Sequence, residues 1–258
     1  FQSMQLPPLN SQWAFFTIPG LSELPSPSYP ENKLENTEWA LKLSHTILMY
    51  DFSVSYFDGW DNIFTPVLVF NPVTQQMQLD RLVFHRTKMF GADFAGSIHS
   101  VGVWGEFAYF RTEDTGGTNP YIKNPYLQYV VGADYTFGYS IKANVQYFQE
   151  YITKVDDDVE EESEEAIISK LGIGIPLQQA ASLRIEKKFG DYDQHRVELF
   201  GFYDIKDQGM MLQPKLVVSP EDAFSLEIGM VIFDGDKESI FGRFGNNDEI
   251  YLKCIYSF

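Results

Sequence analysis

The feature that most constrains this chain is a period-2 alternation of apolar and polar residues, repeated along most of its length. Residues 139–151 show it most clearly. Ile141 and Val145 fall on one face of an extended strand, whereas Lys142 and Gln146 fall on the other. The alternation therefore predicts strands that separate an apolar environment from a polar one.

The same pattern predicts a succession of strands joined alternately by short turns and long links. Strands are expected over residues 36–44, 47–57, 86–98, 100–112, 124–137, 139–152, 178–189, 194–205, 209–218, 222–233 and 248–258. Short turns are expected near 45–46, 99, 138, 190–193, 206–208 and 219–221, and long links over 58–85, 113–123, 153–177 and 234–247. Single-chain bacterial barrels have even strand numbers. Either residues 11–18 supply a further strand, or strands precede this chain in a longer protein.

Two architectures fit such a pattern. In a soluble sandwich or lipocalin-like barrel the apolar face is the core, whereas in a membrane barrel it meets lipid. The segments are about 10–14 residues long, near the length that crosses a bilayer, and aromatic residues such as Trp39, Tyr56 and Tyr203 lie near their ends. We therefore predict an all-β fold: an antiparallel up-and-down transmembrane β-barrel of about 12 strands. Short periplasmic turns and long extracellular loops are expected.

Composition excludes several other classes of protein. The net charge of −17 argues against non-specific nucleic-acid binding, and the 16% aromatic content argues against disorder. A single cysteine, Cys254, excludes an intrachain disulfide. Residues 1–4 resemble the remainder of an expression tag, although they can equally be native, and residues 5–35 form a Pro-rich irregular segment with one possible strand. The barrel is expected over residues 36–258.

The C-terminus carries the most specific signal. Its alternate apolar positions resemble the terminal strand of Gram-negative outer-membrane proteins, which the barrel-assembly machinery reads. The residues of this assembly signal are Ile250, Leu252, Tyr256 and Phe258. Cys254 lies on the same face and is expected to meet lipid as a small apolar residue.

Five stretches carry a resemblance to a known family. They are Leu34–Trp39, Ser55–Asp61, Gly105–Thr112, Asn124–Tyr129 and Ile250–Phe258. They look like a family of porin-like outer-membrane barrels, loosely related to alginate-export-type porins. The resemblance implies a multi-pass barrel in the outer membrane of a Gram-negative bacterium. That family has no agreed catalytic residues, so none can be transferred.

No enzyme signature is present in the sequence. The chain has no Gly-x-Ser-x-Gly elbow and no His-Glu-x-x-His pair, so we predict no catalytic, cofactor-binding or metal-ligating residues and no cofactor. Three of the four histidines lie near predicted periplasmic turns. His85 lies with Arg81, Arg86 and Lys88, a basic strand end that is either simply solvated or contacts lipopolysaccharide phosphates.

The expected site is the barrel lumen, lined by the charged residues of the polar face. These are Glu38, Lys42, Asp51, Asp93, Glu106, Asp134, Lys142, Glu150, Arg184, Glu186, Lys188, Arg196, Glu198, Asp204, Lys215, Glu227, Glu249 and Lys253. They suit a porin-like channel for passive passage of small solutes, mildly cation-preferring. An acidic run over 156–165 is expected to repel anions from its mouth.

Two alternatives stay open: a non-conducting structural or partner-binding outer-membrane barrel, and a soluble β-barrel binding module. The expected partners are outer-membrane lipid, lipopolysaccharide, the barrel-assembly machinery and small solutes, with no nucleic acid. The sequence leaves the oligomeric state and the identity of the solute open.

Overall fold

The structure is a computed structural model that describes residues 8, 10–14, 25–72, 75–119, 122–154, 178–221, 223–237 and 239–257. The regular structure in this part of the chain is almost entirely β. Its elements are η1 (Leu34–Asn36), β1 (Trp39–Ile47), β2 (Tyr50–Trp60), β3 (Thr65–Asn71), β4 (Gln76–Val83), β5 (Arg86–Ile98), β6 (Val101–Arg111), β7 (Tyr126–Phe137), β8 (Ile141–Ile152), β9 (Gln179–Phe189), β10 (His195–Asp204), β11 (Gly209–Glu221), β12 (Phe224–Gly235), η2 (Gly242–Phe244) and β13 (Glu249–Tyr256). Among the described helices, none is long and apolar enough to cross a membrane.

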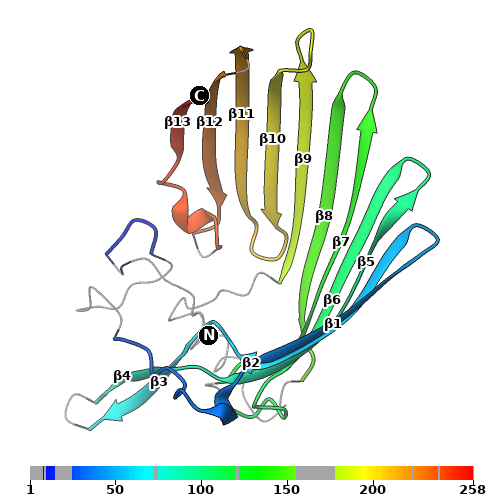
Figure 1. Cartoon of the computed structure of the whole chain (residues 1–258). Helices are drawn as coiled ribbons and strands as arrows, with labels where there is room; N and C mark the ends of the chain where they lie inside the picture. Colours follow the sequence, from blue (N-terminus) through cyan, green and yellow to red (C-terminus); the bar gives the residue numbers. More distant parts are fainter. Residues whose placement is uncertain are drawn as a thin grey trace.

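One large antiparallel sheet dominates the fold. It contains 11 strands in the order β1-β2-β5-β6-β7-β8-β9-β10-β11-β12-β13, and Figure 1 shows it curving round between its two edge strands, β1 and β13. Within the described residues, neither edge strand has a partner on its outer side. The fold is therefore all-β and up-and-down, of the transmembrane-barrel type, with an open seam. Of the further strand expected over 11–18, residues 11–14 are irregular and 15–18 lie outside the described residues.

Tight turns join the strands at one end of the sheet, where the C-terminus also lies (Figure 1). The first of them corrects the sequence analysis, because it lies at Leu48 and Met49 instead of 45–46. Both residues have positive φ, 51° and 69°, in a two-residue hairpin that pairs Ile47 with Tyr50. Such turns usually carry Asn or Gly, so this one gave no local signal. The first two strands end three residues later than predicted, with their faces unchanged.

The link over 58–85 also differs from expectation, because it contains a second, two-stranded sheet made of β3 and β4. Phe64, Leu82 and Phe84 are buried beside this hairpin, with Trp60 and Leu79 packed against them. This small cluster is a conventional apolar core. Most of the link over 153–177, including the acidic run over 156–165, lies outside the described residues.

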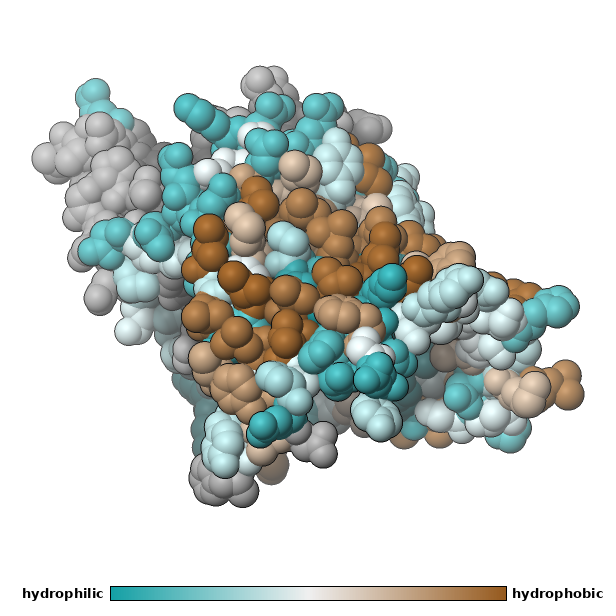
Figure 2. All heavy atoms as spheres, turned by 90° about the horizontal axis from the view of Figure 1, so that it is seen from above, coloured by the Kyte–Doolittle hydropathy of each residue, from teal (hydrophilic) through white to brown (hydrophobic). Residues whose placement is uncertain are grey.

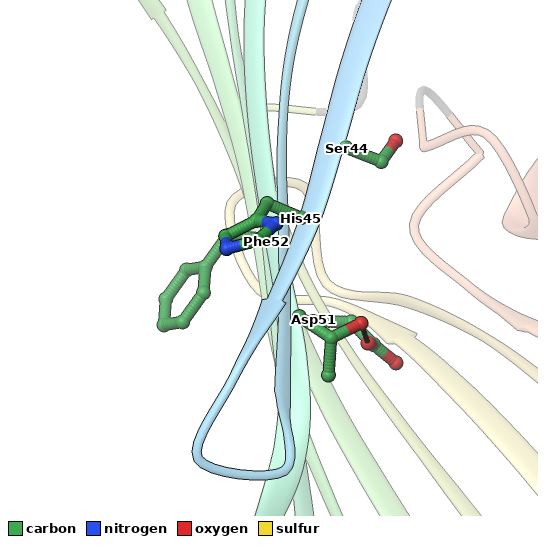
Figure 3. Close-up of a pocket in the computed structure, with 5 residues that line it drawn as sticks. Ser44, His45, Asp51 and Phe52 are labelled. Carbon is green, nitrogen blue, oxygen red and sulfur yellow. Dashed lines mark hydrogen bonds between the residues drawn. The ribbon is translucent and has the colours of Figure 1, made fainter.

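The two faces of the large sheet differ sharply in chemistry. One carries exposed apolar side chains, for example Val145 at 51% and Leu252 at 65% exposure. Figure 2 shows apolar residues gathered in a broad patch bordered by hydrophilic ones. Figure 3 shows the alternation within one hairpin, with His45 and Phe52 on one side and Ser44 and Asp51 on the other. An exposed apolar face of this extent is what a strand-built membrane protein presents to lipid.

Aromatic side chains border that apolar face at both ends. Tyr56 lies six positions from Tyr50 on β2, and Tyr129 lies six positions from Tyr135 on β7. Six residues of strand extend about 20 Å. At a strand tilt of about 40° this is roughly 15 Å along the membrane normal, so these rings lie inside the ends of an apolar band of about 25 Å, near the aromatic girdles of outer-membrane barrels.

Candidate functional site

The candidate site is the polar face of the large sheet, the face opposite the exposed apolar one. The strand register brings the residues predicted to line a lumen onto this face. Lys142 is opposite Glu186, Glu186 is opposite Glu198, and Glu198 is opposite Lys215 across four consecutive strands. Each predicted residue lies in a strand of this sheet except Glu38, which precedes β1 and accepts a hydrogen bond from the backbone N–H of Trp60 at 3.0 Å.

An ion-pair cluster on β9, β10 and β11 lies at the middle of this face. Glu198 is 8% exposed and is its centre. Arg184 donates to one of its oxygens through Nη2 at 2.7 Å, and Lys215 Nζ lies 3.4 Å from the other. Arg196 Nε is 3.9 Å from both Glu198 and Glu186. Three bases thus surround two carboxylates, which holds these side chains against the sheet.

Further predicted residues flank this cluster. Lys188 pairs in register with Arg196, and Lys253 with Glu227. Tyr251 donates through Oη to Glu227 at 3.1 Å. The Tyr251 ring occupies the space above Gly229. A Cβ atom at position 229 would lie only 2.5 Å from the ring. A glycine at this position is therefore needed for the ring to lie flat across the polar face.

Acidic residues dominate the wall formed by β2, β5, β6 and β7. Asp93 receives hydrogen bonds from Lys42 Nζ at 3.0 Å and from the hydroxyl of Ser53. Asp51 accepts a hydrogen bond from Thr46 Oγ1 at 2.6 Å, and Glu106 is opposite Asp93 in register. Within the described residues, the acids of this wall include Asp134 on β7, and the bases at its two sides are Lys42 of β1 and Lys142 of β8. Arg184, Lys188, Arg196 and Lys215 lie on β9 to β11.

Glu150 closes the polar face at the end away from the tight turns. It is buried, accepts a hydrogen bond from Gln128 Nε2 at 2.6 Å and lies 3.1 Å from Lys123 Nζ. Lys123 Nζ also lies 3.5 Å from the centre of the Tyr126 ring. Burial raises the pKa of the nearby Asp61, in the loop that follows β2, although Lys123 partly opposes that rise. These groups fix loops to the wall.

An aromatic cluster covers the polar face of β10 and β12 at this same end. Phe241, in the loop before β13, lies 5.4 Å from Phe202 and 6.4 Å from Phe233 between ring centres. Trp13 approaches Phe233 at 6.0 Å and Phe244 at 5.8 Å. The loop carrying η2 therefore folds onto the polar face. The sequence does not predict this cover, because the loop has no periodicity. Its one trace in the sequence is the pair Phe202 and Phe233, which fall on a polar face.

The described residues of the predicted assembly signal lie on β13, as does Cys254. Ile250, Leu252 and Tyr256 of the assembly signal are exposed on the apolar face of β13, whereas Phe258 lies outside the described residues. Cys254 is exposed on the same face, opposite Leu226. Asp204 and Glu249 stand at the ends of β10 and β13, and Asp204 is fully buried.

The basic strand end around His85 is not one site. His85 Nδ1 lies 2.8 Å from Glu113, Arg81 pairs with Asp80, and Arg86 pairs with a different carboxylate. In the described residues, His85 contacts the Glu113 carboxylate, and His195 Nδ1 accepts a hydrogen bond from the backbone N–H of Ser219 at 3.1 Å. None of these contacts joins a histidine to a serine hydroxyl, as a serine nucleophile requires.

A pocket at the β1–β2 hairpin is lined by Ser44, His45, Thr46, Asp51 and Phe52 (Figure 3). These residues come from both faces of the sheet. The pocket is therefore a hollow at an edge hairpin, and among the described residues Asp51 is the one charged residue of the polar face that lines it.

Comparisons with known proteins show similarity in the arrangement of strands only. No family model matches the chain, and no curated protein matches it. Among solved structures, the chain is similar to a KdgM porin, with 8% identity, a TM-score of 0.34, and coverage of 86% of this chain and 92% of the porin. It is also similar to an outer membrane phospholipase dimer from Salmonella typhi with bound calcium, with 11% identity, a TM-score of 0.35, and coverage of 85% and 77%. The phospholipase A from Escherichia coli gives 12% identity, a TM-score of 0.33 and the same coverage. At these scores the likeness carries no argument about function.

Proposed function

We propose that this protein is an outer-membrane porin-like channel for the passive passage of small solutes. The observation that carries the proposal is the inverted placement of its side chains. Charged and polar residues occupy one face of a curved, barrel-type sheet, and apolar residues are exposed on the other. Such a sheet, closed on itself in lipid, encloses a polar path. No catalytic role is proposed for any residue.

A mild cation preference is the finer part of the proposal. The wall of β2, β5, β6 and β7 supports it, because Glu106 and Asp134 lie on the polar face with no ion pair among the described residues, and Asp93 pairs with Lys42. On β9 to β11, Arg184, Arg196 and Lys215 share the carboxylates of Glu186 and Glu198. Lys142 and Lys188 form no ion pair among the described residues. Cations are expected to pass along the acidic wall, because acids outnumber bases there.

Conductance in a planar lipid bilayer tests the channel. The refolded protein is expected to give discrete steps of current in potassium chloride. In a salt gradient, the sign of the reversal potential is expected to show that cations pass more readily than anions. Replacing Glu106 with Gln and Asp134 with Asn should move that potential towards zero. Asp191→Asn, at an exposed tight turn, is the matched control and should leave it unchanged. Current without selectivity would remove only the cation preference.

A non-conducting barrel is the second candidate, and a specific observation favours it. The ion pairs around Glu198 and the aromatic cover at Phe241 both occupy the polar face. A narrow barrel can be filled by such side chains. Protein that is folded in lipid, shifts on a gel only after boiling and passes no current would support this candidate. Solubility without detergent would instead favour a soluble binding module.

A further inference from the structure

A row of basic side chains lies on the apolar face of β5 and β6, at the end away from the tight turns. Arg86 and Lys88 alternate along β5, and Lys88 is opposite Arg111 of β6 in register. Lys88 is also opposite Asp58 of β2. We call Arg86, Lys88 and Arg111 the basic rim. Its side chains lie on the lipid side of the sheet, so they are distinct from the charges of the polar face.

The depth of the basic rim follows from the strand below it. The apolar face of β5 continues from Phe90 to Ile98, about nine residues or roughly 30 Å along the strand. A strand tilt of about 40° reduces this to roughly 23 Å along the membrane normal, near the 25 Å apolar band of outer-membrane barrels. The next outward positions, Lys88 and Arg111, therefore stand at the level of the lipid headgroups.

Aromatic rings mark the same boundary immediately below the basic rim. Tyr56 lies 4.8 Å from Trp39 and 4.9 Å from Phe90 between ring centres. Tyr109 is opposite Phe90 in register. Tyr and Trp concentrate at the interface between lipid and water. The face therefore carries basic residues at the level of the lipid headgroups, aromatic residues at the interface and aliphatic residues along the lipid chains.

The basic rim carries more positive charge than its carboxylate neutralises. Asp58 lies 2.6 Å from Arg86 Nε and 3.5 Å from Lys88 Nζ. Arg86 also donates to the backbone carbonyls of Glu35 and Thr37. Lys88 stays 47% exposed, and Arg111 is exposed with no ion pair among the described residues. Glu113 accepts a hydrogen bond from the backbone N–H of Arg86 at 2.8 Å, so the three bases of the rim exceed the two carboxylates beside it by one positive charge.

We propose that the basic rim binds the phosphates of lipopolysaccharide in the outer leaflet. Lys88 and Arg111 are the two binding side chains, and Asp58 with Arg86 positions Lys88. The long links lie at this end of the sheet, which is the extracellular end in barrels of this type. Bases at a membrane surface attract anionic headgroups, at about 1 kcal/mol or fivefold in affinity for each one. The proposal is independent of whether the lumen conducts.

Native mass spectrometry of the detergent-solubilised protein tests this, with lipid A and with lipid A stripped of its phosphates as probes. The wild-type protein is expected to retain lipid A and to lose the dephosphorylated form. The double variant K88Q/R111Q should retain lipid A about 30-fold more weakly. Lys187→Gln is the matched control, because Lys187 lies on the same face at the tight-turn end, opposite Ile141 and Val197. It should leave retention unchanged.

Three outcomes overturn the proposal: equal retention of both probes by the wild type, an unchanged double variant, or an equal loss in the Lys187 variant. A gel shift on boiling reports whether each variant is folded. Where the double variant does not fold, the salt dependence of the wild type decides. Retention that falls between 0.05 and 0.5 M salt supports the phosphate contact, because salt screens exposed charges, and retention that does not change contradicts it.

Discussion

The hairpin of β3 and β4 and the large sheet use the same kinds of residue in opposite ways. In the hairpin, Leu82 of β4 is 0% exposed and packs with Phe64 and Phe84. In the large sheet, Leu252 is 65% exposed, whereas Glu198 is nearly buried. The hairpin is therefore built as a water-soluble element, with its apolar residues inside. The large sheet instead suits an apolar solvent, lipid, on its outer face. This contrast locates the membrane-facing part of the chain.

The largest expected effect is on the hairpin core. Leu82→Ala should lower the stability of this region by about 2–5 kcal/mol, because it leaves a cavity in packed protein. Leu252→Ala should cost less, since lipid or detergent fills the space left on an exposed face. Hydrogen exchange of the hairpin amides measures the first, and urea unfolding in detergent measures the second. An equal loss of stability at both positions would contradict the difference between the two regions.

The next effect tests which face of the sheet meets lipid. Val145→Arg should hinder insertion by about 2–4 kcal/mol, because the residue lies on the apolar face of β8. Gln146→Arg is the neighbouring control, and it should be tolerated because the polar face already holds arginine. The folded fraction in lipid vesicles, read from the gel shift on boiling, is the measurement. Should both variants fold equally well, the assigned face is wrong.

A smaller effect is expected inside the polar face. Glu198→Gln should lower stability by about 1–2 kcal/mol, because Arg184, Arg196 and Lys215 would then repel one another. The exposure of Arg184 limits the loss. Glu106→Gln is the matched control, since Glu106 forms no ion pair within the described part of the chain. Urea midpoints in detergent compare the two, and equal midpoints would mean that the cluster adds nothing.

The smallest effect concerns the aromatic cover over the polar face. Trp13→Ala should cost about 0.5–1.5 kcal/mol, the range for aromatic contacts such as those with Phe233 and Phe244. Faster protease cleavage of the N-terminal segment, with the barrel intact, is the expected readout. Trp39→Ala is the control on the exposed face and should leave that cleavage rate as it is.

Much of the large sheet could be predicted from the sequence. The strand expected over 86–98 is β5 itself, and the one expected over 178–189 differs from β9 by a single residue. Alternation is a local property of an extended backbone, so it can be read without knowing the partners of a strand. The alternation does not predict the hairpin of β3 and β4, because Pro66 and the uninterrupted apolar run over 67–70 break the period of two. The turn at Leu48 and Met49 is not predicted either, because neither residue is typical of a turn.

The sequence alone therefore determined which side chains share a face, and with them the barrel-type fold, because the period of a strand is set within the strand. Only the tertiary structure decided which charges meet. Lys42 and Asp93 are 51 residues apart, and Glu198 joins bases from β9 and β11. The acidic and basic walls, the aromatic cover and the basic rim all depend on register between strands. Register is a property of pairs, because each contact needs two segments that the sequence does not place side by side.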